Sequence, residues 1–432
     1  MEWIEVAVLA VTFFGLLALG VPIAFSIGIA TVCTMLMSIH SLPALTTVAQ
    51  RMATGIDSFA LLAIPFFILS GQFMNRGGIA RRLIDLAKVV VGRLPGSLAY
   101  VNILAAMLFG AISGSAVAAA AAIGGFMTPL MRKDHYDRDY SAAVNITSAT
   151  TGLIIPPSNI LIVYSLASGG VSIAALFLAG YLPGALMGMA LMVVAGVIAK
   201  RRGYPVGDRV PAREAVKRLL DAIPSLFLLI VVMGGIVAGI FTATEASAVA
   251  VLYTFVLAVL IYREVKWSEI PKVLLDSTAT TAVVMLLVGS SMGMSWILSY
   301  ENIPQNVSAA LIALTESKIA ILIIINVLLL LVGTFMDMTP AVLIFTPIFL
   351  PVVRQLGMDP IHFGIMMTMN LCIGLCTPPV GSVLFVGCGI AETTIAKVIR
   401  PLLPMFIAMI VTLLITTYWP PLTLWLPRLF GY

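Results

Sequence analysis

The sequence predicts an all-α, polytopic membrane protein built from two related halves. Of its 432 residues, 61% are hydrophobic and only 10% are charged, whereas soluble domains are about 45–50% apolar and about 25% charged. Apolar runs long enough to cross a bilayer recur along the whole chain. Two of these runs are interrupted in the same way, by GLIIPPSN at 152–159 and GLCTPPVG at 374–381, which lie 222 residues apart.

The apolar runs give the expected order of helices. They cover residues 4–20, 22–39, 54–75, 97–131, 138–168, 172–199, 222–240, 243–262, 273–300, 318–352, 361–389 and 396–420. One crossing needs about 20 residues, so 97–131 and 318–352 are too long for a single span. Small or polar residues interrupt both, AISGSA at 111–116 and GTFMDMTP at 333–340. We expect each to form a re-entrant helical hairpin.

Basic residues orient the helices, because cytoplasmic loops carry the excess of Lys and Arg. Of the 24 basic residues, 20 lie in the five segments 76–96, 132–138, 200–218, 263–272 and 397–400. All five share one face if ten helices cross the membrane and both hairpins return to the side from which they enter. Both termini are then periplasmic.

Three polar segments connect the spans. Residues 76–96 are expected to form an amphipathic helix in the membrane interface, since Leu83, Ile84 and Ala87 share one apolar side. Residues 200–221 read as a cytoplasmic basic loop. Residues 301–317, which are not rich in basic residues, read as a periplasmic connector.

The two halves repeat with opposite orientation. At an offset of 222, Gly152 meets Gly374, Pro156 meets Pro378, and Pro157 meets Pro379. Each half contains two spans, a third span, a connector, a hairpin, a broken span and a final span. An inverted-topology repeat of this kind is typical of secondary transporters.

The broken helices predict two sodium sites. Unwound carbonyls and half-helix ends can hold a cation, and oxygen is the ligand that hard cations prefer. One hairpin tip facing one broken helix forms one site. The first site is expected to comprise Ser113, Gly114, Ser115, Gly152, Pro156, Ser158 and Asn159. The second is expected to comprise Gly333, Thr334, Met336, Asp337, Thr339, Gly374, Thr377, Pro379 and Gly381.

Other polar residues in apolar segments have two interpretations each. Asp337 is the acidic residue at the centre of a hairpin. It is either a functional carboxylate, the usual role of an acidic residue inside a membrane, or a cap of the following helix. Asn145, Ser148 and Asn370 either line the substrate pathway or satisfy hydrogen bonds between helices. His362, at a loop edge, is expected to be interfacial.

Six segments along the chain form a recognisable set of motifs. They are AIPFFILSGQFMNRGGIARRLIDLA (63–87), GAISGSAVA (110–118), GLIIPPSNILIVY (152–164), TATEASAVAVLY (242–253), GTFMDMTPAVLIFTPIFLPVV (333–353) and CTPPVGSVLFV (376–386). Together they resemble the large membrane (permease) subunit of TRAP transporters, the tripartite ATP-independent periplasmic type. The resemblance runs from end to end. Ala243 departs from it, because the family usually has a proline there, whereas Glu245 matches and is expected to be structural.

The resemblance implies a sodium-driven symporter for small organic acids in a bacterial inner membrane, with the ion-transporter fold of a scaffold and a moving elevator domain. The scaffold would comprise residues 1–75 and 222–300, and the elevator would comprise 97–199 and 318–426. The implied partners are a separate small four-helix membrane subunit and a soluble periplasmic binding protein, with no nucleic acid and no cofactor other than the coupling ion. Specificity lies largely in the binding protein, so C4-dicarboxylate, sialic acid and other acids stay open.

Two other functions compete with this one. A stand-alone symporter of the divalent-anion type has a similar inverted repeat, but its Ser-Asn-Thr tip is not matched by residues 113–115. An intramembrane enzyme is disfavoured, because neither a His-Glu-x-x-His pair nor Gly-x-Gly-Asp occurs and Ser113 has no histidine partner. Cys372 and Cys376 share a helical face but lack further ligands, so we interpret them as small packing residues and expect no metal other than sodium.

Overall fold

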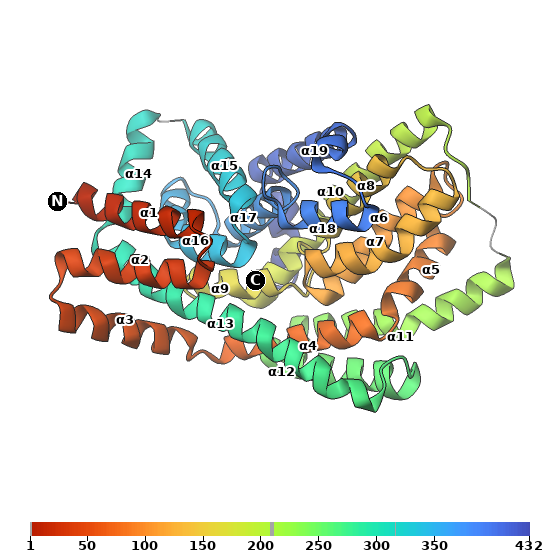
Figure 1. Cartoon of the computed structure of the whole chain (residues 1–432), viewed down its shortest axis with the longest axis horizontal. Coiled ribbons are helices and arrows are strands. Elements are labelled where there is room, and N and C mark those ends of the chain that lie inside the picture. The colour runs from red at the N-terminus through yellow and green to blue at the C-terminus, as the bar shows by residue number, and fades with distance from the viewer. Residues whose placement is uncertain (1, 208–210, 316) are drawn as a thin grey trace.

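The computed structural model describes residues 2–207, 211–315 and 317–432, and these form helices joined by short connections (Figure 1). The all-α prediction is confirmed. The first half contains α1 (Glu2–Ala18), α2 (Ile23–Ser38), α3 (Ser41–Ile56), α4 (Ala63–Arg76), α5 (Ile79–Val91), α6 (Ser97–Ser113), α7 (Ala116–Lys133), α8 (Arg138–Thr151), α9 (Asn159–Ala167) and α10 (Ile173–Arg202).

The second half follows a similar order. It contains α11 (Ala212–Val237), α12 (Ala243–Phe255), α13 (Ile270–Tyr300), α14 (Ile303–Leu314), α15 (Lys318–Phe335), α16 (Met338–Gln355), α17 (Pro360–Gly374), α18 (Ser382–Ala391), α19 (Ile395–Tyr418) and α20 (Pro421–Leu429). When the numbering is shifted by 222 residues, α6 corresponds to α15, α7 to α16, α8 to α17 and α9 to α18. Both Pro-Pro peptides are cis.

Helix lengths agree with a membrane protein of several spans. Within the described residues, eight helices are long and apolar enough to cross a membrane. Helices α15 and α16, the arms of the second hairpin, are among them at 18 residues each. Helices α1 and α2 are apolar but shorter. The return of each hairpin to its side of entry stays a prediction, since arm length alone does not decide it.

The connectors differ from the sequence-based expectation. Helix α3 begins well before the predicted apolar run 54–75. The polar residues around Gln50 interrupt the hydrophobic pattern, so the sequence did not predict this amphipathic helix. The expected loop 200–221 is helical at both ends: α10 continues to Arg202 and α11 begins at Ala212, where Glu214 and Arg218 form an ion pair one helical turn apart. The connector 301–317 is mostly helix α14. The expected boundary at 426 falls within α20.

Helix α5 forms as predicted, but protein covers its apolar side. Ile79, Leu83 and Ala87 are fully buried, and α5 packs on α6 and α11. The start of the connector is tied to the opposite half of the chain: Arg76, the last residue of α4, pairs with Asp276, and the guanidinium of Arg82 in α5 lies 3.5 Å from the centre of the Tyr262 ring. The connector is therefore anchored to protein on two sides.

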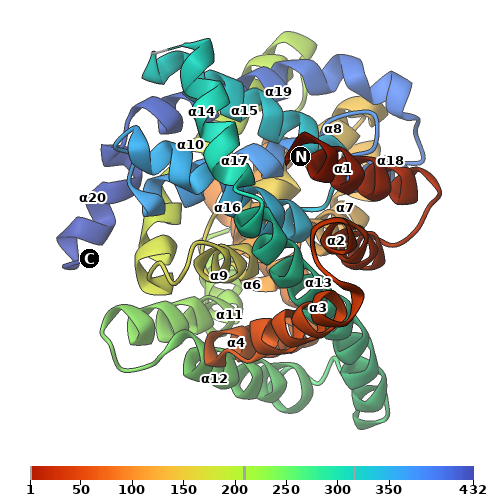
Figure 2. The ribbon, with the colours of Figure 1, turned by 90° about the vertical axis from the view of Figure 1, so that its left-hand side faces the viewer.

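The helices form two packed groups. In the first group α13 packs on α2, α3 and α4, while α12 packs on α4 and α11, and α1 packs on α2. Helices α3, α4, α12 and α13 lie along the lower edge of Figure 1. The second group comprises α6–α10 and α15–α20. Within it the halves interlock crosswise, since α7 packs on α18 and α16 packs on α9. Figure 2 shows α13 passing across the second group, where it contacts α16.

Candidate functional site

The first hairpin turns at residues 113–115. Helix α6 ends at Ser113, and Gly114 has a φ of +63°, the left-handed conformation that glycine tolerates. Ser115 then caps α7, because its Oγ accepts a hydrogen bond from the N–H of Ala118 at 3.2 Å. The tip thus joins the carbonyl end of one helix to the N–H end of the next.

The first broken helix is interrupted between Thr151, the last residue of α8, and Asn159, the first residue of α9. Pro156 and Pro157 lack the N–H that a continuing helix needs. Ser158 is fully buried, and its Oγ finds no hydrogen-bond partner in the described part of the chain. Leaving a buried hydroxyl unpaired costs about 1–3 kcal/mol, so this oxygen is available to a ligand.

Glycines bring the first tip and the first break together. A β-carbon on Gly110 would lie 2.8 Å from the Cα of Gly152, and one on Gly152 would lie 2.4 Å from the Cα of Gly110. A β-carbon on Gly114 would lie 2.9 Å from Nδ2 of Asn159. Larger residues therefore cannot occupy these positions without a shift. The structure thus brings Gly114 of the first expected site against Asn159. Ser113 and Ser115 flank Gly114 in the tip, and Pro156 and Ser158 lie in the break that begins at Gly152.

The second hairpin and the second break meet in the same way. A β-carbon on Gly333 would lie 3.1 Å from the Cα of Gly374, and one on Gly374 would lie 2.5 Å from the Cα of Gly333. The N–H of Gly381 donates a hydrogen bond to the carbonyl of Thr334 at 3.2 Å. This bond joins the hairpin tip directly to the break.

Carbonyl oxygens converge at the second break. A β-carbon on Gly381 would lie 2.7 Å from the carbonyl oxygen of Leu375 and 2.9 Å from that of Thr377. The Thr377 hydroxyl donates to the carbonyl of Ile373 at 2.7 Å, which leaves its oxygen lone pairs free to accept. Such oxygens are suitable ligands for a hard cation.

The two junctions differ in exposure. At the second tip Asp337 lies directly before α16, and its exposed side chain forms no capping hydrogen bond; Pro379 across the junction is exposed as well. Thr339 is half-buried, whereas the side chain of Met336 is buried and leaves only its backbone for a ligand. Ser158 at the first junction is fully buried. The first junction is thus the more enclosed of the two.

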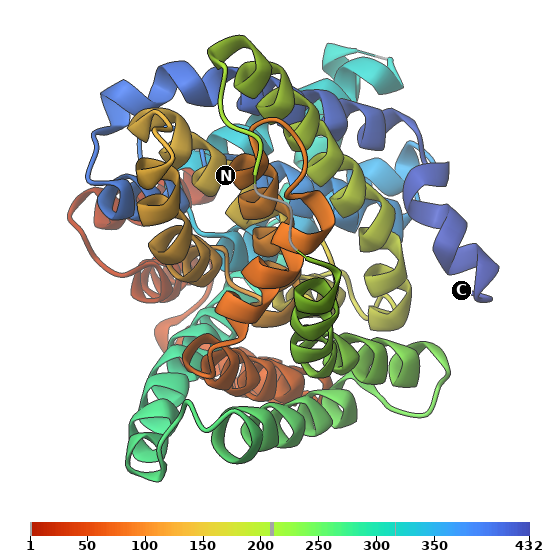
Figure 3. The ribbon, with the colours of Figure 1, turned by 90° about the vertical axis from the view of Figure 1, so that its right-hand side faces the viewer.

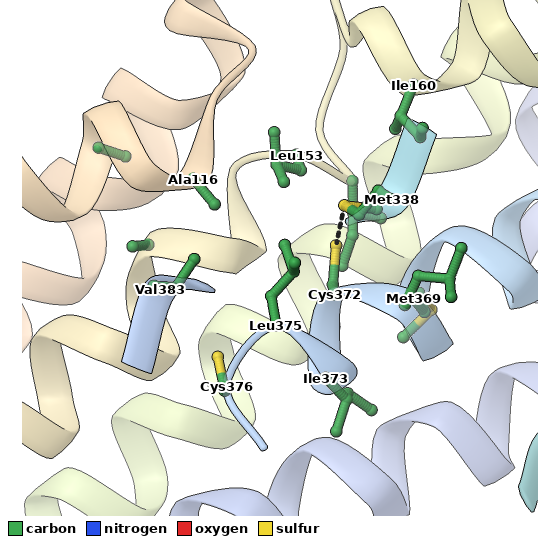
Figure 4. Close-up of a cluster of buried hydrophobic side chains, with 14 of the residues drawn as sticks. Ala116, Leu153, Ile160, Met338, Met369, Cys372, Ile373, Leu375, Cys376 and Val383 are labelled. Atoms are coloured by element: carbon green, nitrogen blue, oxygen red, sulfur yellow. Dashed lines mark hydrogen bonds between the residues drawn. The ribbon is translucent and has the colours of Figure 1, made fainter. Parts of the chain in front are cut away.

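An apolar cluster separates the two junctions and joins the two halves (Figure 4). Met338 from the second hairpin points at Cys372 of α17, with 4.0 Å between the two sulfur atoms. Leu153 from the first break packs in the same cluster. Cys376 is also buried and directs its thiol at the carbonyl of Ile146 at 3.4 Å. Both cysteines therefore lie at packing positions.

The three expected pathway residues lie between helices. Asn145 donates to the carbonyl of Ala120 at 3.0 Å, and Ser148 donates to Oδ1 of Asn102 at 3.1 Å. These partners favour the second interpretation, hydrogen bonds between helices.

Asn370 is held in the same manner. It is fully buried, and its Nδ2 donates to Oδ1 of Asn326 at 2.7 Å. Asn326 was not predicted to take part in this contact. A lone amide in the apolar run KIAILIIINVLLLL is nevertheless a recognisable signal of a buried polar contact.

Gly71 of α4 is a further residue at the first tip that the sequence did not predict. A β-carbon on Gly71 would lie 2.9 Å from the carbonyl oxygen of Ser113, so the first group of helices approaches the first hairpin tip through this glycine. Only the tertiary structure reveals this approach.

The arrangement resembles solved transporters. The crystal structure of the YdaH transporter of Alcanivorax borkumensis matches with a TM-score of 0.66, over 88% of this chain and 89% of that one, at 14% identity. At that identity the likeness concerns the fold alone. The fold therefore defines an all-helical, multi-span membrane protein with the architecture of known transporters.

Sequence comparison identifies the family. The family described as "Tripartite ATP-independent periplasmic transporter, DctM component" matches residues 10–422. The chain is 55% identical to "Uncharacterized protein YgiK" of Salmonella typhimurium, over 99% of this chain and 98% of that protein. It is 40% identical to "C4-dicarboxylate TRAP transporter large permease protein DctM" of Pseudomonas aeruginosa, over 94% of each. The chain belongs to the DctM family of TRAP transporter large permease subunits, which are transporters and not enzymes, so the resemblance seen in the sequence is confirmed.

Proposed function

We propose that this chain is the permease subunit of a sodium-coupled symporter that imports a small organic acid. The observation that carries the proposal is the pair of matched junctions, in which each hairpin tip touches one broken helix through two glycines. The unpartnered Oγ of Ser158 and the converging carbonyls at Gly381 supply oxygen ligands. The name of the Pseudomonas relative supports a carboxylate as substrate.

Transport is proposed to follow an elevator mechanism. Residues 97–199 and 318–426, extended to the end of α20, would move as one body, and residues 1–75 and 222–300 would form the scaffold. Crosswise packing of α7 on α18 and of α16 on α9 supports a single moving body. The approach of Gly71 to the first hairpin tip supports a close, side-chain-free sliding contact.

Membrane orientation and partners belong to the same proposal. The distribution of basic residues supports an inverted repeat with re-entrant hairpins and with both termini in the periplasm of a bacterial inner membrane. Membership of a tripartite family supports two partners, a small membrane subunit and a periplasmic binding protein. The binding protein would then select the acid.

Reconstitution tests the proposal. The chain is incorporated into proteoliposomes alone and together with a candidate small subunit and a candidate binding protein, and uptake of a radiolabelled organic acid is measured. We expect uptake only with all three proteins and an inward sodium gradient; an equal potassium gradient serves as the control. Uptake by the chain alone would instead establish a stand-alone symporter of the divalent-anion type.

A further inference from the structure

A cavity of about 450 Å³ has no lining residue in common with either junction. Its polar lining includes Lys318 at the start of α15, Asp359 before α17, Tyr418 at the end of α19 and Arg428 in α20. Lys318 and Thr334 lie near opposite ends of α15, about 24 Å apart at 1.5 Å per residue. The cavity is therefore separate from the proposed sodium sites.

The C-terminal helix that closes this cavity has no counterpart in the first half. By the 222-residue offset, the whole of α10 corresponds to residues 395–424, yet α19 ends at Tyr418. Pro420 and Pro421 stop the helix there, because proline cannot continue it. Helix α20 then packs on α10 and α17. The cavity thus exists because the second half departs from the repeat.

His362 holds α20 in place. Its Nδ1 lies 2.7 Å from Oγ1 of Thr423, and its Nε2 lies 3.2 Å from the carbonyl oxygen of Thr417. The side chain is only 1% exposed, so it is enclosed by protein, and its expected place at the membrane interface stays a prediction. This contact fixes the helix that carries Arg428 beside the start of α15.

The charges in the cavity favour an anion. Lys318 and Arg428 are exposed, and neither forms an ion pair with any residue that the structure describes. The carboxylate of Asp359 is already engaged as a helix cap, since its Oδ1 accepts from the N–H of Ile361 at 2.7 Å. Among the described residues that line the cavity, Lys318 and Arg428 are thus cationic without an ion-pair partner, and the carboxylate of Asp359 is already capping a helix.

The surroundings of the cavity match the edge of a bilayer. Trp419 and Trp425 are each 55% exposed, and Phe430 and Tyr432 extend the aromatic surface. Tryptophan and tyrosine gather where acyl chains meet headgroups. Ile319, next to Lys318, is 60% exposed and continues into the apolar side of α15. Figure 3 shows the C-terminal helix at the outer edge of the molecule, where lipid can reach it.

We propose that this cavity binds the phosphate headgroup of an anionic phospholipid. Lys318 and Arg428 would donate charge-assisted hydrogen bonds to the phosphate oxygens, and the aromatic side chains would lie along the glycerol and upper acyl chains. The bound lipid would join the first arm of the second hairpin to the last helix of the chain. The proposal is independent of which acid is transported.

Lipid binding to the purified chain tests the proposal. Binding of phosphatidylglycerol is measured by native mass spectrometry for the wild type and for the double variant Lys318→Gln/Arg428→Gln. Phosphatidylcholine with the same acyl chains gives the reference for headgroup charge. A surface cation contributes about 1 kcal/mol to binding an anionic lipid, so two should change the affinity on the order of tenfold or more. The matched control is Lys397→Gln/Arg400→Gln, which removes two exposed cations from the opposite end of α19.

The proposal is supported if phosphatidylglycerol binding weakens in the first double variant and not in the control. The charge-preserving variant Lys318→Arg/Arg428→Lys should bind as the wild type does, which separates a lost ligand contact from a folding defect. Equal binding in all variants, or no preference over phosphatidylcholine, would overturn the proposal. Displacement of the lipid by millimolar inorganic phosphate would also overturn it, because the cavity would then be a site for a soluble anion.

Discussion

Replacing Gly152 by alanine is expected to separate the first hairpin from the first broken helix. The new β-carbon would lie 2.4 Å from the Cα of Gly110 and 2.9 Å from the amide nitrogen of Ala111. Ordinary contact begins at 3.4 Å, so backbone must move by about 1 Å against backbone. Overpacking of this kind costs about 1–3 kcal/mol.

Sodium activation should weaken together with stability. Ligand distances in a metal site hold to within about 0.2 Å, and a shift of about 1 Å between tip and break is far larger. We therefore expect the sodium concentration for half-maximal uptake to rise at least about tenfold, which corresponds to about 1.4 kcal/mol. The assay is sodium-dependent uptake in proteoliposomes, with the melting temperature of the purified protein measured with and without sodium.

Gly125→Ala provides the matched control. Gly125 lies in α7, and a β-carbon there would meet nothing within 4 Å. Alanine favours a helix over glycine by about 1 kcal/mol, so this variant should retain its sodium dependence and at least its thermal stability. A Gly152→Ala protein with wild-type sodium activation would refute the reasoning.

Three further changes test other parts of the structure. Ser158→Ala removes an unpartnered buried hydroxyl, so stability without sodium should be unchanged or higher by about 1 kcal/mol. Sodium activation should weaken in this variant, and unchanged activation would show that Ser158 is not a sodium ligand. Asn326→Leu removes the side-chain acceptor of Nδ2 of buried Asn370, which keeps its bond to the backbone carbonyl of residue 326 at 3.0 Å, so the protein should be destabilised by about 0.5–1.5 kcal/mol. Thr46→Val, at an exposed position in α3, should have a small effect on the melting temperature. A cysteine in place of exposed Arg213 should react with a membrane-impermeant reagent only after the cells are opened, and labelling of intact cells would contradict the proposed orientation.

Local chemistry made the breaks predictable from the sequence. Pro156 and Pro378 lack the N–H that a helix needs, and the structure ends α8 and α17 just before the two Pro-Pro segments. The apolar runs likewise located most helices, because membrane helices are continuous in hydrophobicity. Helix α3 and the start of α11 were missed, since their polar residues resemble loop sequence although they suit amphipathic helices.

Contacts between segments distant in the chain could not be predicted from these local sequence patterns. The residues of each junction were grouped by the repeat, but a single sequence contains no distance between Gly110 and Gly152 or between Gly71 and Ser113. The hydrogen-bond partners of His362 were not predicted for the same reason, because they lie 55 and 61 residues further along the chain. Hydrogen bonds between distant helices depend on packing that local sequence patterns do not encode.

Equilibrium binding of radioactive sodium to the purified chain tests the central claim most directly. We predict saturable binding that potassium does not displace, and we predict that Gly152→Ala and Gly374→Ala each weaken it while Gly125→Ala does not. Absence of saturable sodium binding, or binding that both junction variants retain unchanged, would contradict the claim that the hairpin tips and broken helices form cation sites.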